Sequence, residues 1–186
     1  KLDLSHYIPR SNYLIKLNNE FEKSNVVFIG TTGNTAREMY SFMPSTTNFY
    51  MAGNMGGALS LGLGASMAGK KIIVCGGDAE FVMHLGGLTT AGRYRDKIDL
   101  TYILFDNESN KSTGGQNTFQ SHLDYKAIAE GSGFKVIGNY VKKLDEFNCI
   151  IDEFKNLKGL KFMHVKCGID EETPRPPLHI IKVNKI

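Results

Sequence analysis

The chain has little of several features that would narrow its class. Its 186 residues include no Trp, only five Pro and only three Cys. Cys75, Cys149 and Cys167 form no Cys-x-x-Cys pair, so neither a disulfide framework nor a zinc site is indicated. We expect these cysteines to be buried thiols in a reducing compartment, which predicts a cytoplasmic location. There is no run of 18 apolar residues and no signal-peptide layout at the amino end, so no membrane span or secretion is expected.

An excess of charge of one sign is also missing. Lys and Arg number 22, Asp and Glu number 19, and no basic run is longer than two residues, so no nucleic-acid partner is expected. Hydrophobic residues make up 41% of the chain and charged residues 22%, which is ordinary for a folded protein. The length predicts one domain over residues 1–186, with residues 1–10 and 177–186 as flanking linker or tail segments.

Short apolar segments alternate with helical patterns along the chain. Six segments rich in apolar and β-branched residues are predicted to be strands: 26–30, 48–52, 71–75, 100–105, 134–137 and 161–165. A first helix is predicted after an N-cap at Ser11 or Asn12, and further helices at 35–43, 56–68, 81–92, 123–132 and 142–157. Several strands are apolar on both faces. We therefore predict an α/β fold: a doubly wound, mainly parallel, six-stranded sheet with helices on both faces.

Glycine, in contrast, is abundant, with 20 residues. Nine of them lie in or beside four loops that follow predicted strands, at 31–34, 53–57, 76–80 and 106–115. Ligands of doubly wound sheets bind beyond the carboxyl ends of the strands, where such loops lead into the next helix. The glycine pattern therefore predicts a ligand site at that edge of the sheet.

Two of these loops carry oxygen ligands suited to a cation. Asp78 follows one predicted strand after Gly77, and Asn107 follows the next strand, 29 positions later. A right-handed βαβ unit of that length brings both strand ends to the same edge. Mg²⁺ prefers oxygen ligands, and the main-chain carbonyl of Ser109 could supply a third. Asp78 could instead be a simple helix cap, which is a common role for Asp.

Four sequence blocks carry a family resemblance. They are TTGNTARE at 31–38, NFYMAGNMGGALSLGLG at 48–64, GDAEFVMHLGGLTTAG at 77–92 and STGGQ at 112–116. Together they resemble the diphosphate-binding domain of thiamine-diphosphate enzymes, whose signature is Gly-Asp-Gly followed after somewhat under thirty residues by Asn-Asn. Ala79 replaces the second Gly of that signature, and Asp106 replaces the first Asn. Within the family the blocks look most similar to phosphonopyruvate decarboxylases, with sulfopyruvate decarboxylases next.

The resemblance implies roles for particular residues. It implies Mg²⁺ ligation by Asp78, Asn107 and the carbonyl of Ser109. It implies contacts with thiamine diphosphate for seven residues: Thr32, Asn34, Gly53, Met55, Gly77, Ala79 and Glu80. The carbonyl of Gly53 is expected to accept a hydrogen bond from the 4′-amino group of the cofactor. Met55 is expected to hold the cofactor in its bent shape.

The resemblance also implies an activity shared with a partner. It implies non-oxidative decarboxylation of phosphonopyruvate, a small anionic 2-oxo acid, to phosphonoacetaldehyde and CO₂, in a homo- or hetero-oligomer. No catalytic residue is expected in this chain, because the activating Glu lies on a pyrimidine-binding domain or subunit. The chain is therefore expected to be inactive alone, either as a carboxyl-terminal fragment, which a first residue other than Met favours, or as a β subunit of the sulfopyruvate decarboxylase type.

Two other classes of function remain open from the residues. A nicotinamide or flavin enzyme would have Gly-x-Gly-x-x-Gly after the first strand, and the segment GTTGNTARE lacks that spacing. A non-catalytic interaction module with this fold is the other alternative. His84 is expected to be packed rather than catalytic. Lys111 and His122 are expected to be solvated, although a cation there is a candidate partner for an anionic substrate.

Overall fold

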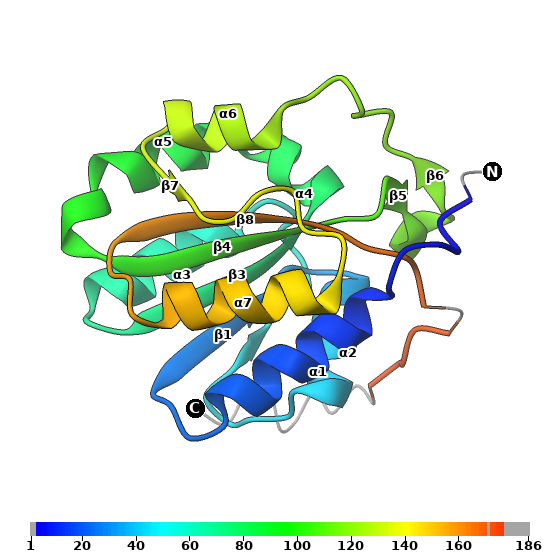
Figure 1. Ribbon diagram of the computed structural model, residues 1–186, viewed down its shortest axis with the longest axis horizontal. Coiled ribbons are helices and arrows are strands. Elements are labelled where there is room, and N and C mark those ends of the chain that lie inside the picture. The colour runs from blue at the N-terminus through cyan, green and yellow to red at the C-terminus, as the bar shows by residue number, and fades with distance from the viewer. Residues whose placement is uncertain (1–2, 171, 177–186) are drawn as a thin grey trace.

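The protein is built on one six-stranded sheet, seen in a computed structural model that describes residues 3–170 and 172–176. The strands are β1 (Val26–Gly30), β2 (Phe49–Tyr50), β3 (Lys71–Gly77), β4 (Asp99–Asp106), β7 (Lys135–Val136) and β8 (Leu160–Lys166). Their order across the sheet is β2-β1-β3-β4-β8-β7, and every neighbouring pair is parallel (Figure 1). The predicted fold class is confirmed, and all six predicted strands are present.

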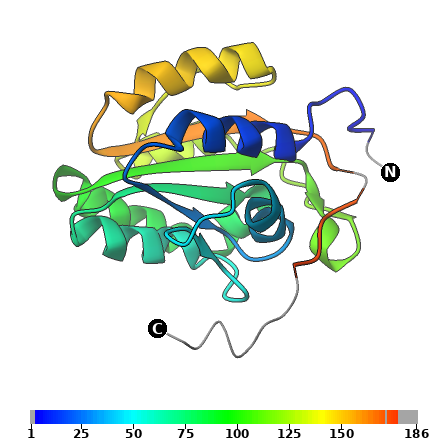
Figure 2. The same ribbon diagram turned by 90° about the horizontal axis from the view of Figure 1, so that it is seen from below.

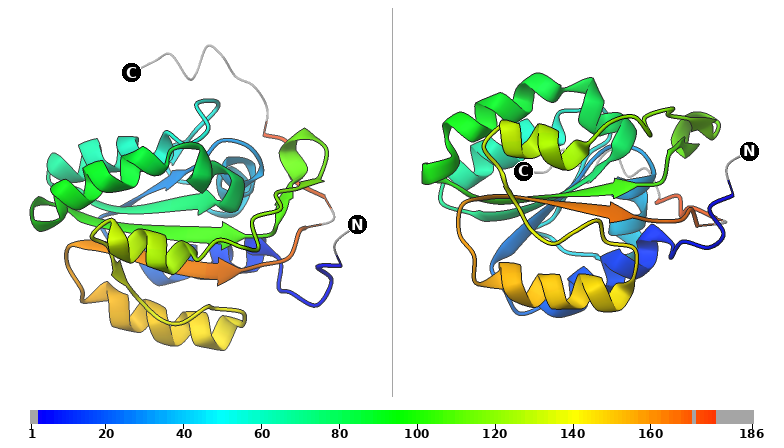
Figure 3. Two further views of the ribbon diagram at one scale, coloured as in Figure 1. Left: turned by 90° about the horizontal axis from the view of Figure 1, so that it is seen from above. Right: turned by 45° about the horizontal axis from the view of Figure 1, so that its top comes forward.

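Helices cover both faces of the sheet. They are α1 (Arg10–Phe21), α2 (Asn34–Phe42), α3 (Ala58–Met67), α4 (Asp78–Met83), α5 (Leu85–Arg93), α6 (Tyr125–Gly131) and α7 (Leu144–Lys155). Figure 2 shows α1 and α7 on one side of the strands, and the helices of the other layer on the opposite side. Figure 3 shows the same layers from two further directions.

Each layer has its own apolar core. Side chains of α1, α2 and α7 pack with alternate residues of β3, β4 and β8, including Ile73, Ile103 and Met163. Side chains of α3, α4, α5 and α6 pack with the other residues of the same strands, including Val74 and Tyr102. The central strands are therefore buried on both faces, which explains why apolar residues occur on both faces of β3, β4 and β8.

Two predicted helix boundaries are wrong. The first helix begins at Arg10 after Pro9, not after a cap at Ser11 or Asn12, and the Ser11 hydroxyl donates to Asp170 Oδ1 at 2.5 Å. The predicted helix at 81–92 is two helices, because the chain turns at His84 between α4 and α5. The His84 ring Nδ1 lies 3.0 Å from the carbonyl oxygen of Gly56, so a contact from another loop fixes the turn.

A small second sheet was not predicted. β5 (Ser109–Asn110) and β6 (Gln116–Asn117) form an antiparallel hairpin around the 3-10 helix η2 (Lys111–Thr113). Figure 1 shows this hairpin beyond the end of β4. Its two-residue strands are polar, so they carry no alternation of apolar residues that the sequence could reveal.

Other expectations have mixed outcomes. Cys75 and Cys167 are buried, but Cys149 is exposed on α7, so the prediction of three buried thiols is wrong for that residue. Residues 177–186, expected to be a tail, lie outside the described residues. In the described part of the chain, no helix has both the length and the apolar character needed to cross a bilayer.

Candidate functional site

A pocket at the carboxyl edge of the sheet contains most of the residues that the sequence singled out. Nine of the ten predicted site residues line it: Thr32, Asn34, Met55, Gly77, Asp78, Ala79, Glu80, Asn107 and Ser109. They lie at or shortly after the carboxyl ends of β1, β2, β3 and β4, as the strand-end rule for doubly wound sheets predicts. Gly53 is the exception: it is exposed and is not part of this lining.

Asp78 is the first residue of α4 and lies directly after β3. Its side chain is buried, and the Thr118 hydroxyl donates a hydrogen bond to Oδ2 at 2.8 Å. Burial, reinforced by the nearby negative charge of Asp106, raises the pKa of Asp78 to about 6. A cation bound beside this buried carboxylate would lower its pKa, because the positive charge favours the ionised form.

Asn107 and Ser109 follow the end of β4. Asn107 is buried, and its Oδ1 accepts a hydrogen bond from the backbone N–H of Ser109 at 3.1 Å. This Asx turn directs the chain from β4 into the hairpin and holds the amide beside the first hairpin strand. Asn107, Ser109 and Asp78 all reach the same pocket.

Asp106, one residue earlier, belongs to a different cluster. Its Oδ2 lies 3.1 Å from His164 Nε2 and 3.3 Å from Lys166 Nζ. Burial opposes ionisation of Asp106, but the hydrogen bond from His164 and the charge of Lys166 outweigh it and lower the pKa of this carboxyl. Asp106 lines a neighbouring pocket with Tyr125 and Tyr140 and is not part of the lining described above.

The other walls of the pocket come from the loops after β1 and β2. Gly33 precedes α2 with φ of 96°, a left-handed conformation that suits glycine, and the turn places Thr32 and Asn34 at the start of that helix. Met55 is half-buried at the pocket. A Cβ at Gly53 would meet nothing within 4 Å, so space remains open beside that backbone.

Glu80 lines the pocket, but its carboxylate is hydrogen-bonded to a side chain of the sheet. The residue is buried, and Oε2 accepts a hydrogen bond from the Tyr102 hydroxyl on β4. Burial raises the pKa of Glu80, although this hydrogen bond opposes the change. The same tyrosine explains Gly76, since a Cβ there would lie 1.9 Å from the Tyr102 oxygen. Gly76 therefore makes room for a side chain, whereas a Cβ at Gly77 would meet nothing within 4 Å.

The donor set of the pocket fits a hard cation. One carboxylate, one amide oxygen and one main-chain carbonyl, from Asp78, Asn107 and Ser109, are oxygen donors of the kind that Mg²⁺ uses together with substrate phosphates. Within residues 3–170 and 172–176, no cluster of three or more His, Cys, Asp or Glu side chains is arranged to hold a metal. A cation at this edge would therefore depend on a bound anion for its remaining ligands.

Sequence reasoning missed one charged pocket residue. Arg10, at the start of α1, lines the pocket and is buried against Glu38 of α2. It comes before the first strand, so neither a strand-end position nor a motif could indicate it. His122 is exposed as expected, but the expectation that His84 is packed is wrong, because this side chain is exposed apart from the contact of its ring with the Gly56 carbonyl. The expectation that Lys111 is solvated is also wrong, because it is half-buried, lines the pocket and donates to the carbonyl oxygen of Asp170.

Fold and pocket together define an α/β protein with a polar candidate site at the carboxyl edge of a parallel sheet, and comparison with known proteins identifies the family. Residues 29–165 match the family described as thiamine pyrophosphate enzyme, C-terminal TPP binding domain. The chain belongs to this family.

Named relatives fall into two groups. The chain is 37% identical over 134 residues to the sulfopyruvate decarboxylase subunit beta of Methanothermobacter thermautotrophicus, covering 72% of this chain and 69% of the relative. It is 36% identical over 110 residues to the phosphonopyruvate decarboxylase of Streptomyces viridochromogenes, covering 59% of this chain but 28% of that protein. A solved structure from Mycobacterium smegmatis, described as a thiamin diphosphate-dependent enzyme, matches with a TM-score of 0.71 at 16% identity and covers 88% of this chain and 32% of its own. The chain therefore spans about two thirds of the first relative and less than a third of the other two.

Proposed function

We propose that this chain is a single diphosphate-binding domain, residues 1–186, that supplies the Mg²⁺ and diphosphate half of the active site of a cytoplasmic 2-oxo acid decarboxylase. One observation carries the proposal: nine of the ten residues assigned from the sequence line one pocket, in a chain that belongs to the thiamine pyrophosphate family. In this proposal Asp78, Asn107 and the Ser109 carbonyl hold Mg²⁺, which neutralises the diphosphate.

The chain's own residues bind and orient the cofactor. In this proposal Thr32 and Asn34, which line the pocket, donate hydrogen bonds to diphosphate oxygens, and the open space at Gly77 lets those oxygens approach the backbone. Gly53 and Met55 face the pyrimidine half in this proposal, the first as a carbonyl acceptor and the second as an apolar support. Thiamine diphosphate, when bound, supplies the electron sink that makes loss of CO₂ from a 2-oxo acid possible.

A partner completes the site. We place the Glu that activates the cofactor on a pyrimidine-binding domain or subunit, so this chain has no catalytic residue of its own and the working enzyme is an oligomer. Support comes from the relatives that are named as beta subunits. The isolated chain is expected to bind Mg²⁺ and thiamine diphosphate weakly and to show no decarboxylase activity.

The proposed substrate is phosphonopyruvate, and sulfopyruvate is the second candidate. Both are three-carbon 2-oxo acids with a second acidic group, so the same cofactor chemistry serves either. Phosphonopyruvate is supported by the sequence blocks and by 36% identity to a named decarboxylase of that acid. Sulfopyruvate is supported by the larger share, 69%, of a beta subunit that the chain covers.

The proposal is tested by reconstitution. The chain is mixed with a pyrimidine-binding subunit or expressed with a pyrimidine-binding domain, and CO₂ release is measured with each acid in the presence of Mg²⁺ and thiamine diphosphate. We expect activity with one acid, dependence on both additions, and loss of activity in Asp78→Ala. Partner binding that is indifferent to Mg²⁺ and cofactor, without CO₂ release from either acid, would instead favour an interaction module. Decarboxylase activity from the isolated chain would contradict the proposed division of the site.

A further inference from the structure

The hairpin after β4 forms a closed unit beside the proposed cation site. Ser109 pairs with Asn117 and Asn110 with Gln116 in the β5–β6 ladder. The backbone N–H of Thr118 donates to the carbonyl oxygen of Glu108 at 3.1 Å, which closes the hairpin at its base. The chain that leaves β4 at Asn107 therefore returns, eleven residues later, to the same edge of the sheet.

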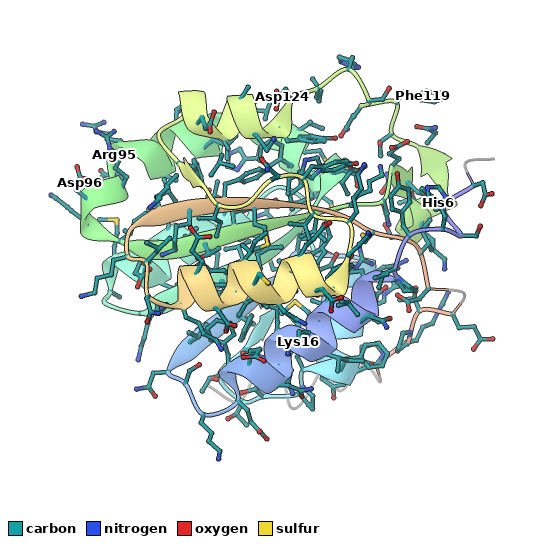
Figure 4. All side chains as sticks on the ribbon, in the orientation of Figure 1. His6, Lys16, Arg95, Asp96, Phe119 and Asp124 are labelled. Carbon is teal, nitrogen blue, oxygen red and sulfur yellow. The ribbon has the colours of Figure 1, made fainter. Side chains whose placement is uncertain are left out.

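The side chain at the end of the hairpin contacts the proposed metal ligand. The Thr118 hydroxyl donates to Asp78 Oδ2 at 2.8 Å, although the two residues are 40 positions apart. Asp78 is 2% exposed, and Thr118 is half-buried. The next residue, Phe119, has φ of 54° and is 77% exposed (Figure 4), so the chain turns sharply outward immediately after this contact.

We propose that Thr118 is a positioning residue for cation binding: its hydroxyl fixes the orientation of the Asp78 carboxylate and locks the hairpin that carries Ser109 against it. The inference rests on the proposed function, because it assumes that Asp78 holds Mg²⁺. A carboxylate has about four lone-pair positions, so one hydrogen bond to Oδ2 leaves positions for a cation. Without the hydroxyl, the carboxylate can rotate and the hairpin loses its side-chain link to α4.

The hydrogen bond adds a side-chain link between the two sides of the proposed cation site, whose strands β3 and β4 are already paired up to Gly77 and Phe105. Asn107 and Ser109 are tied to each other by the 3.1 Å hydrogen bond between them, but both belong to the β4 side of the pocket. Asp78 belongs to the β3 side. The Thr118 hydroxyl makes a side-chain contact between the two sides, and outer groups that orient ligands in this way typically change metal affinity by about 10- to 100-fold when removed.

The test compares Mg²⁺ affinity among matched threonine variants of the full chain. Isothermal titration with MgCl₂ at a fixed excess of thiamine diphosphate, corrected for the heat of adding MgCl₂ to the cofactor alone, is performed on the wild type, Thr118→Val and Thr118→Ser. Thr113→Val is the control, because the Thr113 hydroxyl lies in the same hairpin but donates to the Asn110 carbonyl and to Gln116. We expect Thr118→Val to bind Mg²⁺ about 10- to 100-fold more weakly, Thr118→Ser to recover affinity to within a few-fold, and Thr113→Val to match the wild type.

The rescue by serine separates positioning from general damage to the fold. A purely structural role for the threonine methyl group would leave Thr118→Val, which keeps that methyl, with wild-type affinity and would weaken Thr118→Ser, which lacks it, and that result would overturn the inference. Thermal unfolding without Mg²⁺ is measured for each variant, and Thr118→Ala replaces Thr118→Val if the valine variant does not fold.

The inference and the proposed function fail in different ways. If Asp78→Ala abolishes Mg²⁺ binding while Thr118→Val and Thr118→Ala bind like the wild type, the inference is overturned and the proposed function stands. If Asp78→Ala binds Mg²⁺ and thiamine diphosphate like the wild type, both are overturned.

Discussion

The ion pair between Arg10 and Glu38 gives the sharpest stability prediction. Arg10 Nε and Nη2 donate to the two Glu38 oxygens at 2.7 and 2.8 Å, and the side chains are only 8% and 2% exposed. Burial alone would lower the pKa of Arg10, but the charge of Glu38 and its hydrogen bonds raise it above the ordinary value. The pair joins the start of α1 to α2, whose first residue, Asn34, lines the pocket.

Removing one partner should leave a buried charge without compensation. We expect Arg10→Met or Glu38→Leu to lower the free energy of unfolding by about 3–5 kcal/mol, a large part of the ~5–15 kcal/mol of a typical domain. The double variant Arg10→Met/Glu38→Leu should lose far less than the sum of the two, because neither charge remains. Urea denaturation followed by far-UV circular dichroism measures all four proteins. Single losses below about 1 kcal/mol, or a double variant that equals the sum, would refute this reasoning.

Three further predictions concern other parts of the fold. Gly76→Ala should destabilise the protein by about 1–3 kcal/mol in thermal or urea unfolding, because a Cβ would lie 1.9 Å from the Tyr102 oxygen; unchanged stability would show that Tyr102 moves freely. Hydrogen bonds, above all from Lys155, lower the pKa of Glu20 to about 2 from 4.5, so the stabilisation is present above pH 4.5 and is lost as the pH falls toward 2. The Tm difference between the wild type and Glu20→Gln should therefore shrink over that window, and a difference that grows there would contradict the assignment. A thiol reagent should modify Cys149 alone in the folded chain and all three cysteines after unfolding; rapid reaction of a second thiol would show that a buried one is accessible.

The sheet could be predicted because its strands carry their own signal. β3, β4 and β8 are apolar on both faces, and each predicted strand lies within a few residues of its observed bounds. The hairpin and the break at His84 have no such signal. The break depends on a contact between His84 and Gly56, which lie 28 positions apart, and the hairpin strands are two polar residues each.

The structural role of each glycine could be predicted only in part. Gly77 and Gly53 face open space, as a ligand site requires. Gly30 and Gly76 instead accommodate Met39 and Tyr102, since an added Cβ would lie 2.6 Å from the Met39 sulfur and 1.9 Å from the Tyr102 oxygen. Composition cannot separate these two uses of glycine, because both need an absent side chain and only the fold shows what fills the space.

The candidate site was accessible to sequence reasoning where strand ends determine position. Asp78 and Asn107 were assigned to one edge from their spacing, and they line one pocket. Arg10 and Thr118 were not assigned, because each acts through a tertiary contact with a residue far away in the chain. Such partners become visible only when helix packing and the hairpin are known.

Mg²⁺-dependent binding of thiamine diphosphate is the most direct test of the central claim. Isothermal titration of the chain with thiamine diphosphate is performed with Mg²⁺ and with EDTA, for the wild type, Asp78→Ala and the control Asp96→Ala. Asp96 lies in the 3-10 helix η1 (Arg95–Lys97), at the opposite end of the molecule from Phe119 in Figure 4, and its side chain is 88% exposed. The account predicts binding that requires Mg²⁺, is retained in Asp96→Ala and is weakened on the order of 100-fold or more in Asp78→Ala. Equal binding by the wild type and Asp78→Ala, or binding unaffected by EDTA, would contradict it.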